Sequence, residues 1–263
     1  METFMNLPNF EEAKVAILPV PYEKTTSYKK GTKNAPKAIL KASNELELYD
    51  EELQKEPYQV GITTLDEIKT LEELEKLETD KFIIAIGGEH IISLPLIKRH
   101  SQENLSILQI DAHADLKDSF ENNKMSHACV MRRVFEINKN ITQVGIRSLE
   151  KKEHEFIKHN KINTFFMKDL IYNKNYIQEI LQTLKENVYL TIDLDALDPS
   201  IMPDVGTPEP GGVRWYQLLS LLKQLFKEKN VVGVDIVELC PNKTTNSDYI
   251  VSKLIYKIIG YKF

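Results

Sequence analysis

Cysteine is scarce in this 263-residue chain, which contains only Cys129 and Cys240 and therefore lacks a disulfide framework. Such sparing use is typical of a reducing compartment, so we expect a cytoplasmic protein. Long apolar runs are also absent, and none approaches the roughly 20 residues that a membrane helix needs. The N-terminus shows no basic segment followed by an apolar one, the pattern of a signal peptide. We therefore expect no membrane partner.

Strong charge of one sign is missing too. Lysine and arginine number 34 against 39 aspartate and glutamate residues, which leaves a formal net charge of −5. A mildly acidic chain is poorly suited to nucleic acid or to an anionic membrane as its main partner. With 42% hydrophobic and 28% charged residues, the composition excludes general disorder and is typical of a folded globular protein.

Repeats, low-complexity tracts and Pro/Gly/Ser-rich linkers are absent, and the length alone allows one domain or two. Short apolar runs rich in β-branched residues recur instead, as is typical of strands buried on both faces of a parallel sheet. These runs lie at 15–20, 58–62, 82–86, 105–110, 141–146, 162–167, 188–192 and 231–237.

Amphipathic stretches lie between most of these runs, and we expect helices at 36–48, 153–158, 175–184 and 215–226. Strands that alternate with helices predict βαβ units and a parallel sheet covered on both faces. In such sheets, ligands bind outside the carboxyl ends of the strands. Functional residues are therefore expected just after the apolar runs.

Polar clusters occur at or just after four of the runs. They are GGEH (87–90), DAHAD (111–115), DLDALDP (193–199), and the pair Asp235 and Glu238. Asp111, His113 and Asp115 are spaced by two residues, as are Asp193 and Asp195, so in an extended backbone each set points to one side.

Several carboxylates directed at one volume raise each other's pKa and cannot all stay ionised without cations. Bound metal solves this problem, and an oxygen-rich ligand set with two imidazoles suits Mn²⁺ and similar ions. The ligands are too many for one tetrahedral zinc, whereas two metals about 3.5–4 Å apart form a known hydrolytic arrangement. DAHAD alone is compatible with a salt-bridged loop, but its combination with the other clusters favours a metal site.

These motifs resemble those of the ureohydrolase family, which includes arginases and agmatinases. The family patterns Gly-Gly-Asp-His, Asp-Ala-His-x-Asp, Ser-His-Gly and Ser/Thr-x-Asp-x-Asp-x-x-Asp-Pro are matched here by GGEH (87–90), DAHAD (111–115), SHACVMRR (126–133) and TIDLDALDP (191–199). The segment 20–43 also resembles the N-terminal region of agmatinases. The resemblance implies an arginase-like fold, a three-layer α/β/α arrangement with an eight-stranded parallel sheet. Candidate site residues from His90 to Glu238 follow different strands and can converge only in one sheet, so we expect a single domain over residues 1–263.

By the same resemblance, the chain holds two Mn²⁺ ions, with Asp111 and Asp193 bridging them. One ion would take His90, Asp111, Asp115 and Asp193, and the other would take His113, Asp111, Asp193 and Asp195. Glu89 replaces the usual aspartate of its motif, precedes a candidate ligand and is not itself expected to bind metal.

The resemblance implies catalytic roles for Glu238, which would pair with a guanidinium group, and for His127, which would relay a proton to the leaving amine. The plain alternatives are a surface carboxylate at a strand end and a capping or core histidine. Asp198 is expected to orient the site without binding metal. The loop at 206–212, rich in proline and glycine, is expected to be rigid and to pack near the metals.

The implied reaction is hydrolysis of the guanidinium group of agmatine to putrescine and urea. N1-aminopropylagmatine is the alternative substrate, and guanidinobutyrate, guanidine, formimidoylglutamate and arginine stay open. Asp118 and Glu121 are candidates to face a second substrate cation, and the alternative is that they are ordinary exposed acids of a loop. An acidic substrate would instead call for Lys117 or Lys124. The family usually assembles as trimers or hexamers, so a homo-oligomer is expected.

Two other classes remain open at this point. A zinc amidohydrolase of the deacetylase type shares the general fold but would use a single catalytic metal. A regulatory protein that binds metal without catalysis is the second, and the complete set of candidate ligands argues against it.

Overall fold

A computed structural model describes residues 2–100, 104–242 and 246–263 of the chain. Its strands form one sheet in the order β2-β1-β3-β8-β7-β4-β5-β6, and every pairing between neighbours is parallel. The strands are β1 Val15–Val20, β2 Ile62–Thr64, β3 Phe82–Gly87, β4 Leu105–Ile110, β5 Ile141–Ile146, β6 Asn163–Phe166, β7 Asn187–Asp193 and β8 Asn230–Val237.

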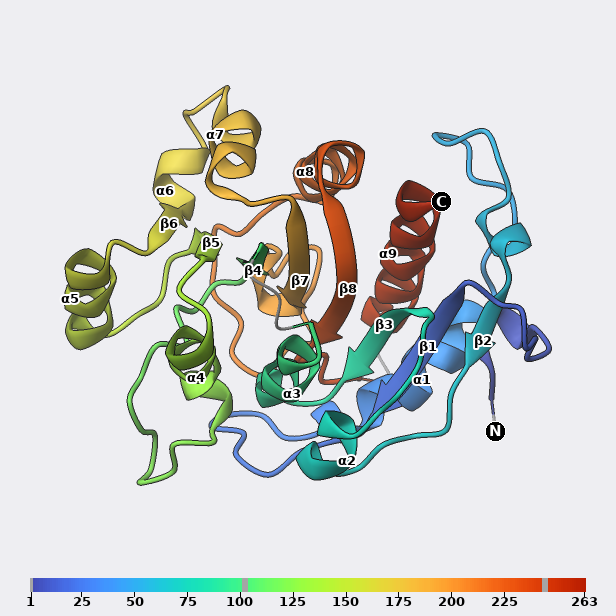
Figure 1. Cartoon of the computed structure of the whole chain (residues 1–263), viewed down its shortest axis with the longest axis horizontal. Coiled ribbons are helices and arrows are strands. Elements are labelled where there is room, and N and C mark those ends of the chain that lie inside the picture. The colour runs from blue at the N-terminus through green and yellow to red at the C-terminus, as the bar shows by residue number, and fades with distance from the viewer. Residues whose placement is uncertain (1, 101–103, 243–245) are drawn as a thin grey trace.

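Helices connect the strands along the chain and cover the sheet (Figure 1). The α-helices in the described part are α1 Ala35–Ser43, α2 Leu71–Glu75, α3 Ser93–Lys98, α4 Val130–Ile137, α5 Lys151–Asn160, α6 Met167–Leu170, α7 Tyr176–Thr183, α8 Trp215–Glu228 and α9 Ser247–Lys262. Among these residues, no helix combines the length and the apolar character needed to cross a membrane.

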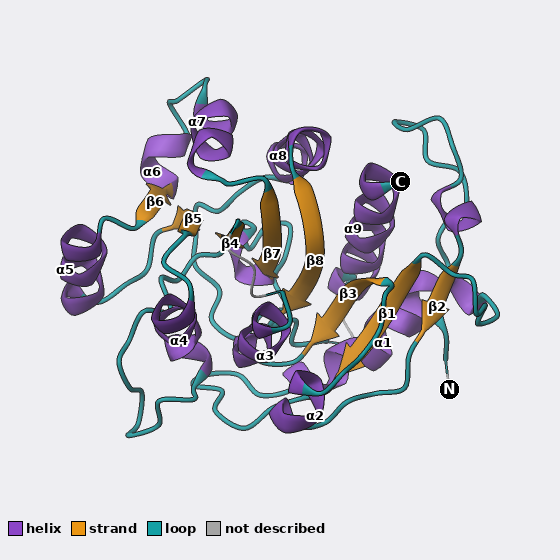
Figure 2. Ribbon diagram, viewed as in Figure 1, coloured by secondary structure: helices purple, strands orange, loops and turns teal. Residues whose placement is uncertain are grey.

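Three layers result, because the side chains of each strand alternate between two hydrophobic clusters. Along β3, Ile84 and Ile86 belong to the cluster packed by α1, α6, α7, α8 and α9, while Ile83 and Ala85 belong to the cluster packed by α2, α3, α4 and α5. Figure 2 shows the two helical layers on opposite sides of the strands. The three-layer α/β/α fold with an eight-stranded parallel sheet, predicted above, is thus confirmed.

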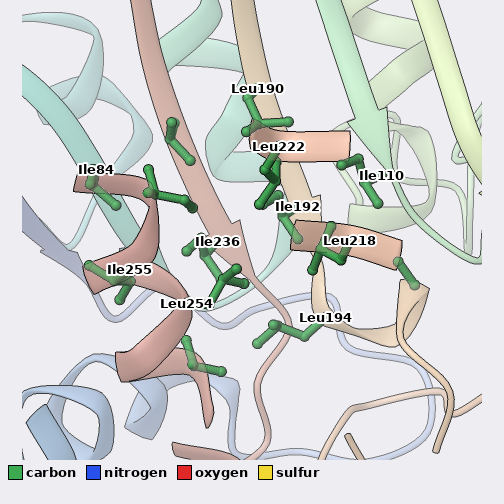
Figure 3. Packing of buried hydrophobic residues seen from close by; sticks show 14 of the residues in the cluster. Ile84, Ile110, Leu190, Ile192, Leu194, Leu218, Leu222, Ile236, Leu254 and Ile255 are labelled. Carbon is green, nitrogen blue, oxygen red and sulfur yellow. The ribbon is translucent and has the colours of Figure 1, made fainter. Parts of the chain in front are cut away.

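The larger cluster fills the space between the central strands and helices α8 and α9 (Figure 3). Ile192 and Ile236 from the sheet face Leu218 and Leu222 of α8, and each is at most 1% exposed. Full burial of each such side chain contributes about 1.5–3 kcal/mol. This packing anchors the carboxyl ends of β7 and β8.

Three local predictions need correction. The helix expected at 36–48 begins at Ala35 and ends at Ser43, and residues 44–48 are not helical. The apolar run at 58–62 was expected to be a strand, but Pro57–Val60 forms a 3-10 turn and the strand begins only at Ile62. Gly61 separates the two, since its φ of 79° is a turn conformation that side chains disfavour. Helix α9 was not predicted, because buried residues lie on most of its sides and leave no amphipathic period.

Strand order explains how distant motifs meet. Strands β3, β8, β7 and β4 are consecutive neighbours at the centre of the sheet, and each leads into one of the polar clusters. Ile192 of β7 lies in register with Ile110 of β4 and with Ile236 of β8. Asp111 and Asp193, each one residue further on, therefore emerge side by side at the carboxyl edge.

Candidate metal centre

His90 lies at the centre of the first group of side chains. Its Nδ1 atom is 3.2 Å from Asp111 Oδ2, 3.0 Å from Asp115 Oδ2 and 3.3 Å from Asp193 Oδ2. His90 and Asp111 are fully buried, and the other two are less than 10% exposed. Burial opposes a positive charge on His90, but these carboxylates outweigh it and raise its pKa well above the usual value. The group therefore attracts positive charge.

The other ring nitrogen of His90 is held by a hydrogen-bonded chain. Thr191 Oγ1 donates to Asp235 Oδ1 at 2.6 Å, so its oxygen accepts from His90 Nε2 at 2.9 Å. Tyr189 donates its hydroxyl hydrogen to the other oxygen of Asp235 at 2.8 Å. With the ring proton placed on Nε2, the Nδ1 lone pair faces the carboxylates.

This arrangement tests whether a cation fits. Nδ1 of His90 is buried and has no hydrogen-bond partner among the described residues, although three carboxylate oxygens lie within 3.3 Å. A lone pair that faces anionic oxygens is unfavourable unless a cation lies between them, either the proton that the raised pKa of His90 favours or a metal ion. The donor set of one imidazole and several carboxylates suits a divalent ion such as Mn²⁺.

A second group shares Asp111. His113 Nδ1 lies 2.8 Å from Asp195 Oδ2 and 3.8 Å from Asp111 Oδ1. The candidate ligand atoms of His90, Asp111 and Asp193 lie within 4.8 Å of one another, and those of Asp111, His113 and Asp195 do likewise. The two groups could thus hold neighbouring ions, with Asp111 between them.

The carboxylates of the cluster are buried and close enough to repel one another. Burial, together with Asp195 and Asp115, raises the pKa of Asp111 to about 7. Burial and the same kind of repulsion raise the pKa of Asp193 well above its usual range. Burial also raises the pKa of Asp195, but its ion pair with His113 dominates and lowers it. Bound cations would remove this repulsion.

Asp115 reaches the cluster through an unusual backbone conformation. Its φ is 53°, in the left-handed region that aspartate tolerates better than most residues. The next residue, Leu116, donates its N–H to Glu153 Oε1, and the Asp115 carbonyl accepts from Arg132 N. These bonds hold the turn that directs the Asp115 carboxylate toward His90.

Glu238 directly follows β8 and lies against the first group. Its Oε1 accepts the backbone N–H of His90 at 2.7 Å. Burial raises the pKa of Glu238 to about 8, although that hydrogen bond favours the carboxylate. Its side chain is buried and not an exposed strand-end carboxylate, so the plain alternative for this residue is wrong.

His127 begins the 3-10 turn His127–Cys129 that leads into α4. Its Nδ1 lies 3.2 Å from both Thr25 Oγ1 and Ser126 Oγ, and its ring stacks edge-on against Phe120 at 5.7 Å between centroids. Burial lowers its pKa. An imidazole with a lowered pKa is neutral near pH 7 and can accept a proton.

A pocket of about 330 Å³ joins these residues. Six of the eight candidate site residues line it, namely His113, Asp115, His127, Asp193, Asp195 and Glu238. His90 and Asp111 are fully buried and are not among its lining residues. The structure therefore brings all eight candidates together at one end of the sheet.

Asp118 and Glu121 do not belong to this pocket, contrary to the expectation that they face a substrate cation. Asp118 is 61% exposed and pairs with Arg133 at 3.1 Å. Besides the candidate site residues, two acidic residues that follow β5 line the pocket, Glu150 and Glu153. The rule that polar residues after strand ends are functional could have found them.

Arg147, which also follows β5, links two segments near the cluster, and the sequence analysis did not single it out. Its guanidinium donates to the carbonyls of Asp195 and Glu209 at 2.7 Å each and to that of Pro210 at 3.0 Å. It thereby ties the Asp195 turn to the loop at 206–212, which packs beside the cluster as expected. Asp198 accepts the backbone N–H groups of Gly211 and Gly212 and so holds that loop.

The sheet is all-parallel, and two His/Asp groups lie at the carboxyl ends of its central strands. This combination is typical of α/β proteins that bind metal ions. Residues 13–260 match the family model described as the arginase family. The chain therefore belongs to the arginase family. Membership of this family, together with its ureohydrolase relatives, identifies the chain as a hydrolase that acts on amidino C–N bonds.

Two curated relatives illustrate the likeness. The chain is 38% identical to the N(1)-aminopropylagmatine ureohydrolase of Synechocystis, over 97% of this chain and 91% of the relative. It is 33% identical to the agmatinase of Pyrococcus horikoshii, over 97% and 95% of the two chains. The solved structure of agmatine ureohydrolase from Thermoplasma volcanium matches with a TM-score of 0.89 at 30% identity, covering 100% of this chain and 94% of that one.

Proposed function

We propose that this chain hydrolyses the guanidinium group of agmatine to putrescine and urea, with N1-aminopropylagmatine as the alternative substrate. The observation that carries the proposal is the buried, unpartnered Nδ1 of His90 facing three aspartate oxygens within 3.3 Å. Such a cluster is suited to divalent cations, and the names of the relatives point to guanidino substrates.

Two Mn²⁺ ions per chain are proposed. His90, Asp111, Asp115 and Asp193 would hold one, and His113, Asp111, Asp193 and Asp195 would hold the other. When bound, such a pair of ions supplies an activated water for hydrolysis at neutral pH. Metal counting on the purified protein separates this proposal from the single-zinc alternative.

Glu238 is proposed to receive the substrate guanidinium. Its carboxylate lines the pocket and is buried, so an ion pair formed there is only weakly screened. The cationic guanidinium favours the ionised carboxylate and lowers the pKa that burial raises. Pairing would hold the planar group in one orientation beside the cluster.

His127 is proposed to deliver a proton to the leaving amine. Its ring lines the same pocket, and its lowered pKa keeps the imidazole neutral before it accepts a proton. General acid–base catalysis by a positioned side chain contributes roughly 10²–10⁴-fold in rate. Loss of the ring should therefore lower kcat.

The pocket rim favours a substrate with a second cation. Lys117 lines the pocket, but its ammonium lies 2.9 Å from Glu150 Oε1, so its charge is compensated. Glu153 adds a further carboxylate to the same wall. An acidic substrate such as guanidinobutyrate would meet these carboxylates, whereas the distal ammonium of agmatine or aminopropylagmatine is attracted by them.

We further propose that residues 1–263 form one domain, because the candidate ligands come from one continuous sheet. A cytoplasmic homo-oligomer, a trimer or a hexamer, is proposed from the family resemblance.

The deciding experiment measures urea release and kcat/KM for agmatine, N1-aminopropylagmatine, guanidinobutyrate and arginine, with and without Mn²⁺. We expect Mn²⁺-dependent turnover with one of the first two substrates preferred. Faster turnover of arginine than of agmatine, or no urea from any of them, would overturn the proposal.

A further inference from the structure

Glu89 is a fully buried carboxylate next to His90 that belongs to neither ligand group and does not line the pocket. Its partners lie instead on the N-terminal segment. Oε1 accepts the backbone N–H groups of Lys24, Thr25 and Thr26, and Oε2 accepts the hydroxyl hydrogen of Thr25. Burial of this charge is therefore compensated by four donors from one short stretch of chain.

The direction of the Thr25 hydrogen bond follows from chemistry. An ionised carboxylate has no hydrogen to donate, so the Thr25 hydroxyl must give its only hydrogen to Glu89. Thr25 Oγ1 is then left with lone pairs alone for its other neighbours. It accepts the backbone N–H of His127 at 3.1 Å and lies 3.2 Å from the ring Nδ1 of the same residue.

That last contact decides where the ring proton sits. Two lone pairs facing each other at 3.2 Å would repel, so His127 Nδ1 must carry the proton and donate it to Thr25. The Ser126 hydroxyl, also 3.2 Å from Nδ1, would favour the opposite tautomer if it donated. The Ser126 hydroxyl can rotate so that its hydrogen points away from Nδ1, whereas the Thr25 hydroxyl hydrogen is already donated to Glu89.

We propose that Glu89 is a positioning residue that acts through Thr25 to keep the proton of His127 on Nδ1, leaving Nε2 as the nitrogen that exchanges protons in the pocket. The inference rests on the proposed function only for the catalytic use of Nε2. The same carboxylate also ties down the chain just before residues 26–29, which line the pocket.

Glu89→Gln tests the proposal because it should reverse the direction of the hydrogen bonds that run from residue 89 through Thr25 to His127. The amide oxygen must face the three backbone N–H donors, which leaves the amide NH₂ directed at Thr25 Oγ1. Thr25 then accepts from residue 89, and its own hydrogen turns to His127 Nδ1. The tautomer of His127 should change from Nδ1–H to Nε2–H without loss of the loop contacts.

The measurement is the ¹⁵N chemical shift of the imidazole nitrogens at pH 8, in the full chain with and without diamagnetic Mg²⁺. The His127 signals are assigned by their loss in His127→Asn. We expect Nδ1–H in the unaltered protein and Nε2–H in Glu89→Gln. An Nε2–H tautomer in the unaltered protein, or the same tautomer in both, would overturn the proposal.

Thr25→Val and Thr25→Ser keep the test decisive if Glu89→Gln does not fold. Valine removes the hydroxyl, so Ser126 becomes the partner of His127 and the tautomer should become Nε2–H. Serine keeps the hydroxyl and should keep Nδ1–H. Identical tautomers in the valine and serine variants would contradict the proposal.

Kinetics add a second readout. We expect Glu89→Gln to lower kcat about tenfold or more, with KM within about twofold, because proton transfer suffers while the pocket wall stays in place. A rise in KM with unchanged kcat would indicate a merely structural role for Glu89 and contradict the proposal. If the protein releases no urea from any guanidino compound, the proposed function fails, yet the tautomer measurement still decides the role of Glu89.

Discussion

His90 Nδ1 and Asp115 Oδ2 lie 3.0 Å apart, although their strands, β3 and β4, are separated in the sheet by β8 and β7. Both residues reach inward over the carboxyl ends of those two strands. The left-handed turn at Asp115 and the hydrogen bond from His90 N to Glu238 direct them there. The centre of the cluster is thus built by loops that cross the sheet edge from opposite sides.

Asp193→Asn removes one charge from the cluster while preserving its shape. Substitution of a residue that is hydrogen-bonded to a metal ligand typically lowers metal affinity or activity 10–100-fold. Substitution of a ligand itself should lower them by at least the same factor. We expect less than two Mn²⁺ per chain by elemental analysis and a loss of most urea release. Two retained metals with full activity would refute the assignment of Asp193.

Asp118→Asn is the matched control for that variant. Asp118 pairs with Arg133 on the surface and lies outside the pocket. Metal content and urea release should both stay at the level of the unaltered protein.

Thr191→Val breaks the chain that orients His90. Asp235 would lose the hydroxyl hydrogen of Thr191, and His90 Nε2 would lose its acceptor. We expect Mn²⁺ affinity, measured by titration calorimetry, to fall about 10–100-fold. Thr142→Val is the control, since its hydroxyl is hydrogen-bonded to that of Thr183 at 2.8 Å and its strand, β5, is not a neighbour of β7. Equal affinities in the two variants would exclude an orienting role for Thr191.

Removal of metal should make stability depend on pH in a defined direction. The folded pKa of Asp111 rises from 3.8 to about 7, and that of His113 rises from 6.5 to about 10. In both cases the folded state binds protons more tightly than the unfolded state, so stability falls as pH rises through each interval. In EDTA we expect a higher melting temperature at pH 5.5 than at pH 9.

Mn²⁺ should raise the melting temperature, and most strongly at pH 9, because the ions replace the protons that the cluster otherwise needs. Differential scanning calorimetry with EDTA and with Mn²⁺ checks both statements. A metal-free protein that melts higher at pH 9 than at pH 5.5 would contradict the raised pKa values of Asp111 and His113.

Glu150→Gln tests the pocket rim. Its carboxylate is 56% exposed beside Lys117, so an ion pair with a distal substrate ammonium contributes modestly. We expect KM for agmatine to rise roughly two- to fivefold with kcat nearly unchanged. Glu155→Gln, on the exposed face of α5 and paired with Lys151, should leave KM unchanged. A fall in kcat with constant KM would assign Glu150 a different role.

Sequence patterns were sufficient for the layers and for most strands. The runs at 15–20, 105–110 and 141–146 coincide with β1, β4 and β5, because a strand buried on both faces must be apolar throughout. The Pro57–Val60 turn shows where that rule fails, because a short apolar run can also form a 3-10 turn, and here only Pro57 of the turn is buried.

The sequence by itself pointed to the residues that the fold brings together in the cluster. Spacing by two at a strand end drew attention to these carboxylates, but the expected extended backbone is wrong there. Asp115 has a left-handed φ of 53° and Asp195 lies in the 3-10 turn Leu194–Ala196, so these turns direct them to the cluster. The sequence could not determine that Asp118 points to solvent while Glu150 lines the pocket, since both are acids in loops after strands. Only the order of strands and the paths of the loops decided this.

The same holds for Glu89, which the sequence marks only as a variant of a motif. Its role depends on contacts with Thr25, 64 residues away in the chain. The direction of a hydrogen bond depends on which atoms are in contact. Only the tertiary structure brings Glu89, Thr25 and His127 into contact in this order. The sequence supplies the candidate ligands, and the fold decides the distances between them, where their protons lie and the shape of the pocket.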